Sequence, residues 1–201
     1  GSGTVSVAVA TFTDAFGNDN TAGSLSPAIA IDTLAPTVAI TSSTPTLRAG
    51  QTATITFTLS EASTTFTAGD VTATGGTLSG FSGSGTSYTA TLTPAVGSVI
   101  PATVSVAAGT FTDAAGNANA FGQLSPPVAI DTVIPSIAIA SSTNTLRAGQ
   151  TATITFTLSE AATNFTVDDV TVAGGSLSAF TGSAASYSAT FTPTAGFTGT
   201  G

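Results

Sequence analysis

The stretch Thr52-Ala-Thr-Ile-Thr-Phe-Thr-Leu59 places threonine at every second position, with an apolar residue between each pair. Successive side chains of an extended chain point to opposite faces. Ala53, Ile55, Phe57 and Leu59 therefore share one face, and the threonines occupy the other. One apolar and one polar face are typical of a half-buried antiparallel strand.

The same pattern continues along the chain. β-Branched residues are frequent, glycine or proline interrupts the pattern about every 8–12 residues, and no segment has a period of 3.6. This predicts an all-β sandwich of about seven strands per 100 residues. The predicted strands are residues 36–41, 51–60, 70–75, 77–81, 86–93, 103–112 and 127–131.

The inward-facing positions of these strands predict the core. They are the large apolar residues at alternate positions and the aromatic residues between strands. The predicted core residues are Val38, Ile40, Ile55, Phe57, Leu59, Phe66, Val71, Leu78, Phe81, Tyr88, Leu92, Val104, Val106, Phe111 and Ile130.

The chain repeats itself with a period of 99 residues. The stretch Thr46–Glu61 returns unchanged as Thr145–Glu160, and 145 − 46 = 99. A unit of this length is a small domain rather than a solenoid repeat. We therefore predict the last part of one repeat at 1–31, a full repeat at 32–131 (the middle repeat) and the first part of a third at 132–201. The two partial repeats lack strands, so their cores should be incomplete.

Composition excludes several classes of function. The 201 residues include 2 basic and 10 acidic side chains, with no cysteine or histidine. A thiolate nucleophile, a histidine base and the usual zinc sites are therefore excluded. Two arginines cannot neutralise a phosphate backbone, so we expect no nucleic-acid partner. We also expect no membrane insertion, because no apolar run is long enough, and this stretch shows no leader peptide.

Most of the acidic residues recur at the 99-residue period. On the predicted sandwich, Asp32 precedes the first strand and Glu61 ends the second. Asp70 begins the third strand, and Asp113 opens the loop after the sixth. Because strands alternate in direction, all four should gather at the end where the chain enters the domain. Arg48 lies in the predicted turn at the opposite end.

Carboxylates gathered without a basic residue repel one another unless a cation lies among them. Oxygen ligands alone favour Ca²⁺ over transition metals. We therefore expect a calcium site at each domain junction, with the loop amides assisting. The predicted ligands at the first junction are Asp32, Glu61, Asp70, Asp113, Asn117 and Asn119. A weaker second site would use Asp131, Glu160, Asp168 and Asp169.

A simpler interpretation stays open for some of these residues. Asp32 and Asp70 suit strand-end caps that accept hydrogen bonds from nearby backbone amides. The sequence Asp113-Ala-Ala-Gly116 also suits an ordinary turn, because glycine tolerates positive φ.

Five blocks, in this order, resemble a known family. They are the Asp-Thr-x-x-Pro connector, Leu-Arg-Ala-Gly-Gln-Thr-Ala-Thr-Ile-Thr-Phe, Ser-Glu, Asp-Val-Thr and Gly-Thr-Phe-Thr-Asp-Ala-Ala-Gly-Asn. They are similar to the tandem bacterial Ig-like repeats of large Gram-negative surface adhesins of the biofilm-associated and type I-secreted kinds. The resemblance implies tandem Ig-like Greek-key sandwiches in a secreted, extracellular stalk that supports cell adhesion and biofilm formation. Calcium often stiffens such stalks, and the adhesin ligand is bound elsewhere in the parent protein.

The leading hypothesis is therefore a non-catalytic extender whose partners are neighbouring repeats of the same chain. One alternative is a module that binds glycan, ice or protein through its loops or threonine rows. Threonine also has a high propensity for β-strands, which explains the threonine rows without a ligand. No tryptophan is available for sugar stacking, which counts against glycan binding. A further alternative is an accessory domain of a large secreted enzyme. Catalysis in this stretch is not expected, because the acids gather at a domain end rather than in a cleft.

Overall fold

The structure is a computed structural model that describes residues 1–199. It divides into two compact units, Gly1–Val133 and Ile134–Gly201, which are described separately. Strands dominate both units, and the described residues contain two short 3-10 helices but no α-helix. The all-β, Ig-like prediction is confirmed. No helix among residues 1–199 is long and apolar enough to cross a membrane.

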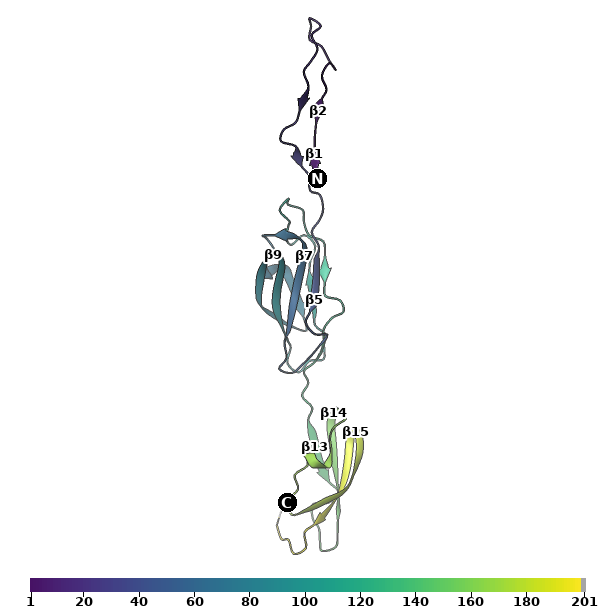
Figure 1. Cartoon of the computed structure of the whole chain (residues 1–201). Helices are drawn as coiled ribbons and strands as arrows, with labels where there is room; N and C mark the ends of the chain where they lie inside the picture. The colour runs from purple at the N-terminus through teal and green to yellow at the C-terminus, as the bar shows by residue number, and fades with distance from the viewer. Residues whose placement is uncertain (200–201) are drawn as a thin grey trace. The chain divides into compact units, whose positions relative to one another are not determined.

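The first sheet of the middle repeat has the order β5-β7-β9 (Figure 1). Its strands are β5 (Val38–Ser42), β7 (Ala53–Ser63) and β9 (Gly76–Pro94). Both pairings are antiparallel, and Phe57 of β7 lies opposite Tyr88 of β9. The alternation that predicted the second strand therefore forms the centre of this sheet, with one face buried.

The second sheet has the order β11-β10-β8. It contains β8 (Val71–Thr74), β10 (Thr103–Val106) and β11 (Gly122–Gln123). A separate parallel pair joins β6 (Thr46–Arg48) to β12 (Ala129–Asp131). This pair connects the start of the repeat to its end.

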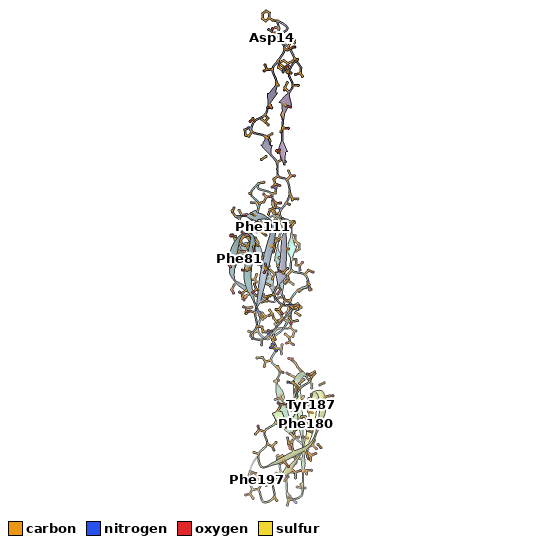
Figure 2. The ribbon with its side chains drawn as sticks, viewed as in Figure 1. Asp14, Phe81, Phe111, Phe180, Tyr187 and Phe197 are labelled. Carbon is orange, nitrogen blue, oxygen red and sulfur yellow. The ribbon has the colours of Figure 1, made fainter. Side chains whose placement is uncertain are left out.

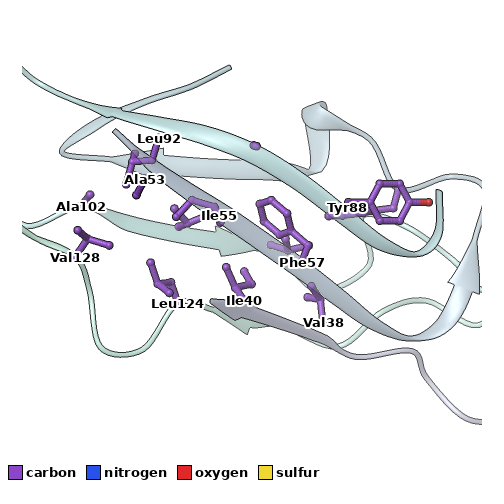
Figure 3. Packing of buried hydrophobic residues seen from close by; sticks show 14 of the residues in the cluster. Val38, Ile40, Ala53, Ile55, Phe57, Tyr88, Leu92, Ala102, Leu124 and Val128 are labelled. Carbon is purple, nitrogen blue, oxygen red and sulfur yellow. The ribbon is translucent and has the colours of Figure 1, made fainter. Parts of the chain in front are cut away.

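The core fills the space between these sheets (Figure 3). Every predicted core residue is either buried there or packs against the buried set, the latter being Val71, Leu78 and Phe81. The close-up shows Ala102, Leu124 and Val128 facing Ala53, Ile55 and Leu92 across the core. The buried core also contains residues that were not predicted, namely Leu47, Ala53, Ala90, Ala102, Leu124 and Val128.

Aromatic rings occupy one end of the core. Phe66 contacts four other rings, with centroid distances between 4.9 and 5.7 Å. The four are Phe57, Phe81, Tyr88 and Phe111, of which Figure 2 labels Phe81 and Phe111. Phe66 itself lies on the connection after β7, so the cluster ties that connection to the sheet.

Two predicted details were wrong, and a third differs only in its division. The predicted strands 77–81 and 86–93 both lie in β9, which folds back on itself: a Cβ on Gly83 would meet the Ser87 carbonyl, and one on Gly76 the Thr93 carbonyl. The predicted strand 103–112 ends at Val106, because the residues after it form a loop held by Asn119. Arg48 ends strand β6 rather than lying in the turn.

The chain before the middle repeat, residues 1–31, is named the arm. It forms an antiparallel hairpin of very short strands. They are β1 (Ser2–Gly3), β2 (Ser6–Val7), β3 (Gly23–Ser24) and β4 (Ile29–Ala30). The two sides of this hairpin are joined at its tip by a turn around Asp14 (Figure 2).

The second unit, described over residues 134–199, is named the open unit. It contains one sheet of order β13-β14-β15. The strands are β13 (Ile137–Ser141), β14 (Ala152–Ala162) and β15 (Gly175–Pro193). Only Phe156, Tyr187 and Ala189 form its buried cluster.

Candidate metal centre

Three acidic residues from three different elements meet at one end of the middle repeat. Glu61 lies near the end of β7, Asp113 opens the loop after β10, and Asp32 lies in the connector before β5. One carboxylate oxygen from each lies within 4.8 Å of the others. Asp113 is buried, Glu61 is half-buried and Asp32 is exposed. The cluster therefore opens to solvent on the side of the connector.

Asp113 is held in place by its own loop. Its Oδ1 accepts hydrogen bonds from the backbone N–H groups of Ala115 and Asn117, each at 2.9 Å. Its Oδ2 accepts one from the Asn117 amide at 2.8 Å. The bond from the Asn117 side chain, followed by the backbone bonds, lowers the pKa of Asp113 against the opposing effect of burial. The Asp113 carboxylate is thus held in one orientation by bonds that favour its charged form.

Asn117 links this loop to the connector. Besides its bond to Asp113, its amide donates to the backbone carbonyl of Asp32 at 3.3 Å. Both bonds come from Nδ2, so Asn117 orients the Asp113 carboxylate and holds the backbone of Asp32 beside it. Gly116, with φ of 93°, makes the tight turn that brings Asn117 back to Asp113.

Glu61 carries the uncompensated charge of the cluster. Its Oε1 atom is buried and has no hydrogen-bond partner. Burial, and then the negative charges of Asp32 and Asp113, raise the pKa of Glu61. A buried carboxylate oxygen without a donor is unfavourable unless a cation satisfies it. The donor set consists of oxygen atoms alone, which fits Ca²⁺.

Two of the predicted ligands are not brought to this cluster. Asp70 caps the short helix η1 (Ala68–Asp70), where its Oδ2 accepts from the backbone N–H of Thr67 at 2.7 Å and from its hydroxyl at 3.0 Å. Asn119 is buried, and both its Oδ1 and its Nδ2 make hydrogen bonds within the loop. Its donors and acceptors bond Ala107, Thr110, Phe111 and Ala120. The simpler interpretation, bonding to nearby backbone amides, therefore describes Asp70, although the element it caps is a short helix. Asp32 also accepts from a nearby amide, the Leu34 N–H at 3.1 Å, and the Asp113 loop is the turn described above.

Each of the four residues predicted for the second site is described by its own contacts. Asp131 accepts a hydrogen bond from the Val133 N–H at 3.2 Å. Asp169 caps η2 (Val167–Asp169) through Thr166, as Asp70 does in the middle repeat. Glu160 is half-buried on β14, and Asp168 is exposed in η2.

The turn around Asp113 has a counterpart 99 residues earlier, at Asp14, which was not among the predicted site residues. In the arm, Asp14 accepts from the backbone N–H groups of Phe16 and Asn18 and from the Asn18 amide, all at 2.9 Å. The Asn18 side chain is the main cause of its lowered pKa. The shared signal is Asp-Ala-x-Gly-Asn, which begins at Asp14 and again at Asp113. The motif thus forms the same turn at Asp14, where no counterparts of Asp32 and Glu61 contribute to it.

Comparison with known proteins gives a family match over most of the chain. Two tandem segments, residues 32–130 and 131–201, match the family described as the bacterial Ig-like domain. No curated protein matches the sequence. Among solved structures, FdeC, an Escherichia coli adhesin, is similar at 19% sequence identity with a TM-score of 0.40. The alignment covers 88% of this chain and 62% of the FdeC chain.

Proposed function

This chain belongs to the bacterial Ig-like domain family, and we propose that it is a non-catalytic extender segment of a secreted bacterial surface adhesin. The observation that carries the proposal is the tandem arrangement of matched segments at a constant 99-residue spacing. Tandem domains separated by short connectors increase reach without adding chemistry. The adhesin ligand would be bound elsewhere in the parent protein, which would act at the cell surface in adhesion and biofilm formation.

We further propose that Ca²⁺ binds at Asp32, Glu61 and Asp113. The support is the meeting of three carboxylates and the buried Oε1 of Glu61 that lacks a hydrogen-bond partner. Calcium takes six to eight oxygen ligands, so water and backbone carbonyls would complete the shell. When bound, the ion supplies positive charge that cancels the repulsion among the carboxylates. It thereby ties the connector residue Asp32 to β7 and to the Asp113 loop.

Calcium is expected to stabilise the middle repeat through Glu61. At a calcium concentration 100-fold above Kd, the free energy of unfolding should rise by about 2.7 kcal/mol. Glu61→Gln should abolish this gain and, in EDTA, should leave the repeat at least as stable as the wild type, because it removes one of three mutually repelling charges. Urea unfolding with and without calcium measures both effects.

The matched control is Asp19→Asn. It removes the same charge from the arm, away from the cluster, and should retain the full calcium effect. Equal stability of the wild type in calcium and EDTA would contradict the metal proposal. The same conclusion would follow from a Glu61→Gln protein that still responds to calcium.

The extender role predicts a change in dimensions on calcium removal. Fixing Asp32 to the middle repeat should restrict the connector, so small-angle X-ray scattering should give a larger radius of gyration in calcium than in EDTA. Identical profiles would contradict stiffening. Saturable binding of a glycan by the isolated chain would instead favour a ligand-binding module.

A further inference from the structure

Four polar or charged side chains are buried among residues 1–199. Three of them, Ser63, Asp113 and Asn119, belong to one end of the middle repeat. Asp113 and Asn119 lie in the loop after β10, and the Ser63 hydroxyl donates to a backbone carbonyl of that loop. The fourth, Thr132, lies in the connector that leaves the repeat after β12 and is only 4% exposed. A connector residue is therefore packed into the domain.

The loop between β9 and β10 holds Thr132 by both its side chain and its backbone. The Thr132 hydroxyl donates to the Ala95 carbonyl at 2.6 Å and accepts from the Ser98 backbone N–H at 2.9 Å. The backbone N–H of Thr132 donates to the Ser98 carbonyl, also at 2.9 Å. Thr132, Ala95 and Ser98 are together named the latch.

The loop of the latch is fixed to the rest of the repeat. The Ala95 N–H donates to the Gly75 carbonyl at 3.0 Å, and the Ile100 N–H donates to the Ser98 hydroxyl at 3.1 Å. A Cβ on Gly75 would lie 2.7 Å from the Pro101 carbonyl, so the far side of the loop packs directly on the turn between β8 and β9. Because β8 and β9 belong to different sheets, the latch connects Thr132 to both of them.

The segment that leads to Thr132 is bonded on both of its sides. On one side β12 pairs in parallel with β6. On the other side Val128 and Ala102 exchange two backbone hydrogen bonds, at 2.8 and 3.0 Å, and Thr132 and Ser98 continue that line. Hydrogen bonds between strands run across the strand direction. Tension along the connector therefore loads these bonds together instead of opening them one after another.

The latch and the candidate metal centre lie at opposite ends of the middle repeat. The loop of the latch comes before β10, and the Asp113 loop comes after it. The entering connector is held near Asp113, where Asn117 bonds the Asp32 carbonyl, and the leaving connector is held by the latch. Tension applied through the two connectors is therefore directed along the strands.

We propose that the latch is the point at which the middle repeat takes up tension from the connector that leaves it. The proposal rests on the extender function, because an extender is stretched through its connectors. Under tension the bonds of Thr132 transfer load to Ala95 and Ser98, and so to β9 and β10. Without them, the load falls on the three-residue pair β6–β12. The latch contains no charged group, so it acts equally in calcium and in EDTA.

The test is the rate of unfolding of the full chain at constant force in EDTA, measured with single molecules. The chain has no cysteine, so Leu34→Cys and Ile134→Cys provide two attachment points, at positions 67% and 75% exposed. Pulling between them loads the middle repeat through its connectors. Thr132→Val keeps the branched shape but removes the hydroxyl, and should unfold about tenfold faster at a given force, a loss of about 1.4 kcal/mol. Thr132→Ser keeps the hydroxyl and should unfold at nearly the wild-type rate.

A second pulling direction separates load bearing from a general loss of stability. Leu34→Cys with Ala108→Cys attaches the force at two exposed positions near the entering connector, so the latch carries no load. In this direction Thr132→Val should change the unfolding rate by less than about twofold. Equal acceleration in both directions would overturn the proposal, because Thr132 would then only stabilise the fold. An unchanged rate when pulling through the connectors would overturn it as well.

The latch and the extender function fail on different results. Equal rates in the two directions overturn the latch and leave the calcium and scattering predictions as they stand. Identical scattering profiles in calcium and EDTA would contradict stiffening of the entering connector. The latch contains none of the proposed metal ligands, so its dependence on the pulling direction would remain.

Discussion

Replacing Phe66 with alanine is expected to lower the free energy of unfolding of the middle repeat by about 3–5 kcal/mol. Phe66 is 4% exposed and its ring touches four other aromatic rings. It comes from the connection after β7 and contacts Phe111 from the loop after β10, so its removal opens a cavity between the two sheets. Three of the four surrounding rings lie on strands β7 and β9, whose backbone holds them in place, so the cavity cannot collapse fully.

The measurement follows Tyr88 during urea unfolding. The chain has two tyrosines and no tryptophan, so Tyr187→Phe leaves Tyr88 as the reporter of the middle repeat. In this background Phe121→Ala is the control, because Phe121 is 61% exposed and its loss should change stability by less than about 0.5 kcal/mol. Similar losses for the two variants would show that the aromatic cluster does not hold the sheets together.

Replacing Asn119 with alanine is expected to cost about 3–4 kcal/mol of stability in EDTA as well as in calcium. The Asn119 side chain accepts from the N–H groups of Thr110 and Phe111, at 2.8 and 2.9 Å. It also donates to the carbonyls of Ala107 and Ala120. Truncation leaves these backbone groups unpaired at a buried position, and each loss is unfavourable.

Asn20→Ala is the matched control for this substitution. Asn20 makes the same kind of bonds in the arm, to Thr11, Phe12, Ala8 and Thr21. Because Asn20 is only part-buried and lies in the arm, its loss should leave the unfolding of the middle repeat unchanged. A loss of stability on Asn119→Ala that appears only in calcium would instead make Asn119 a metal ligand, as the sequence predicted.

Much of the fold could be predicted because its cause is local. Alternation in residues 52–59 assigns a strand and also its buried face, since side chains of a strand change face at every residue. The parallel pair β6–β12 was missed, because Thr46–Arg48 is too short to show alternation and pairs with residues more than 80 positions later. The end of β10 was missed because Asn119 supplies the competing hydrogen bonds from a distant position.

The candidate site could be predicted only in part. Strand direction was enough to bring Asp32, Glu61 and Asp113 to one end of the repeat. Strand direction also predicts Asp70 and Asn119 at that end, because it determines backbone positions and not the bonds that side chains make. Asp70 has an amide donor three residues away at Thr67, and Asn119 has donors and acceptors on both sides of its loop.

By itself, the sequence determined the all-β class, the 99-residue repeat and the small set of acidic residues from which a cation site can be built. Only the tertiary structure decided which of those residues meet. Local donors satisfy Asp70 and Asp113 alike, but only Asp113 is brought beside Asp32 and Glu61, whose buried Oε1 has no donor. The physical reason is that a local hydrogen bond needs only the neighbouring backbone, whereas the meeting of three carboxylates needs three segments to pack together. The charge left uncompensated therefore depends on contacts between segments that are distant in the sequence.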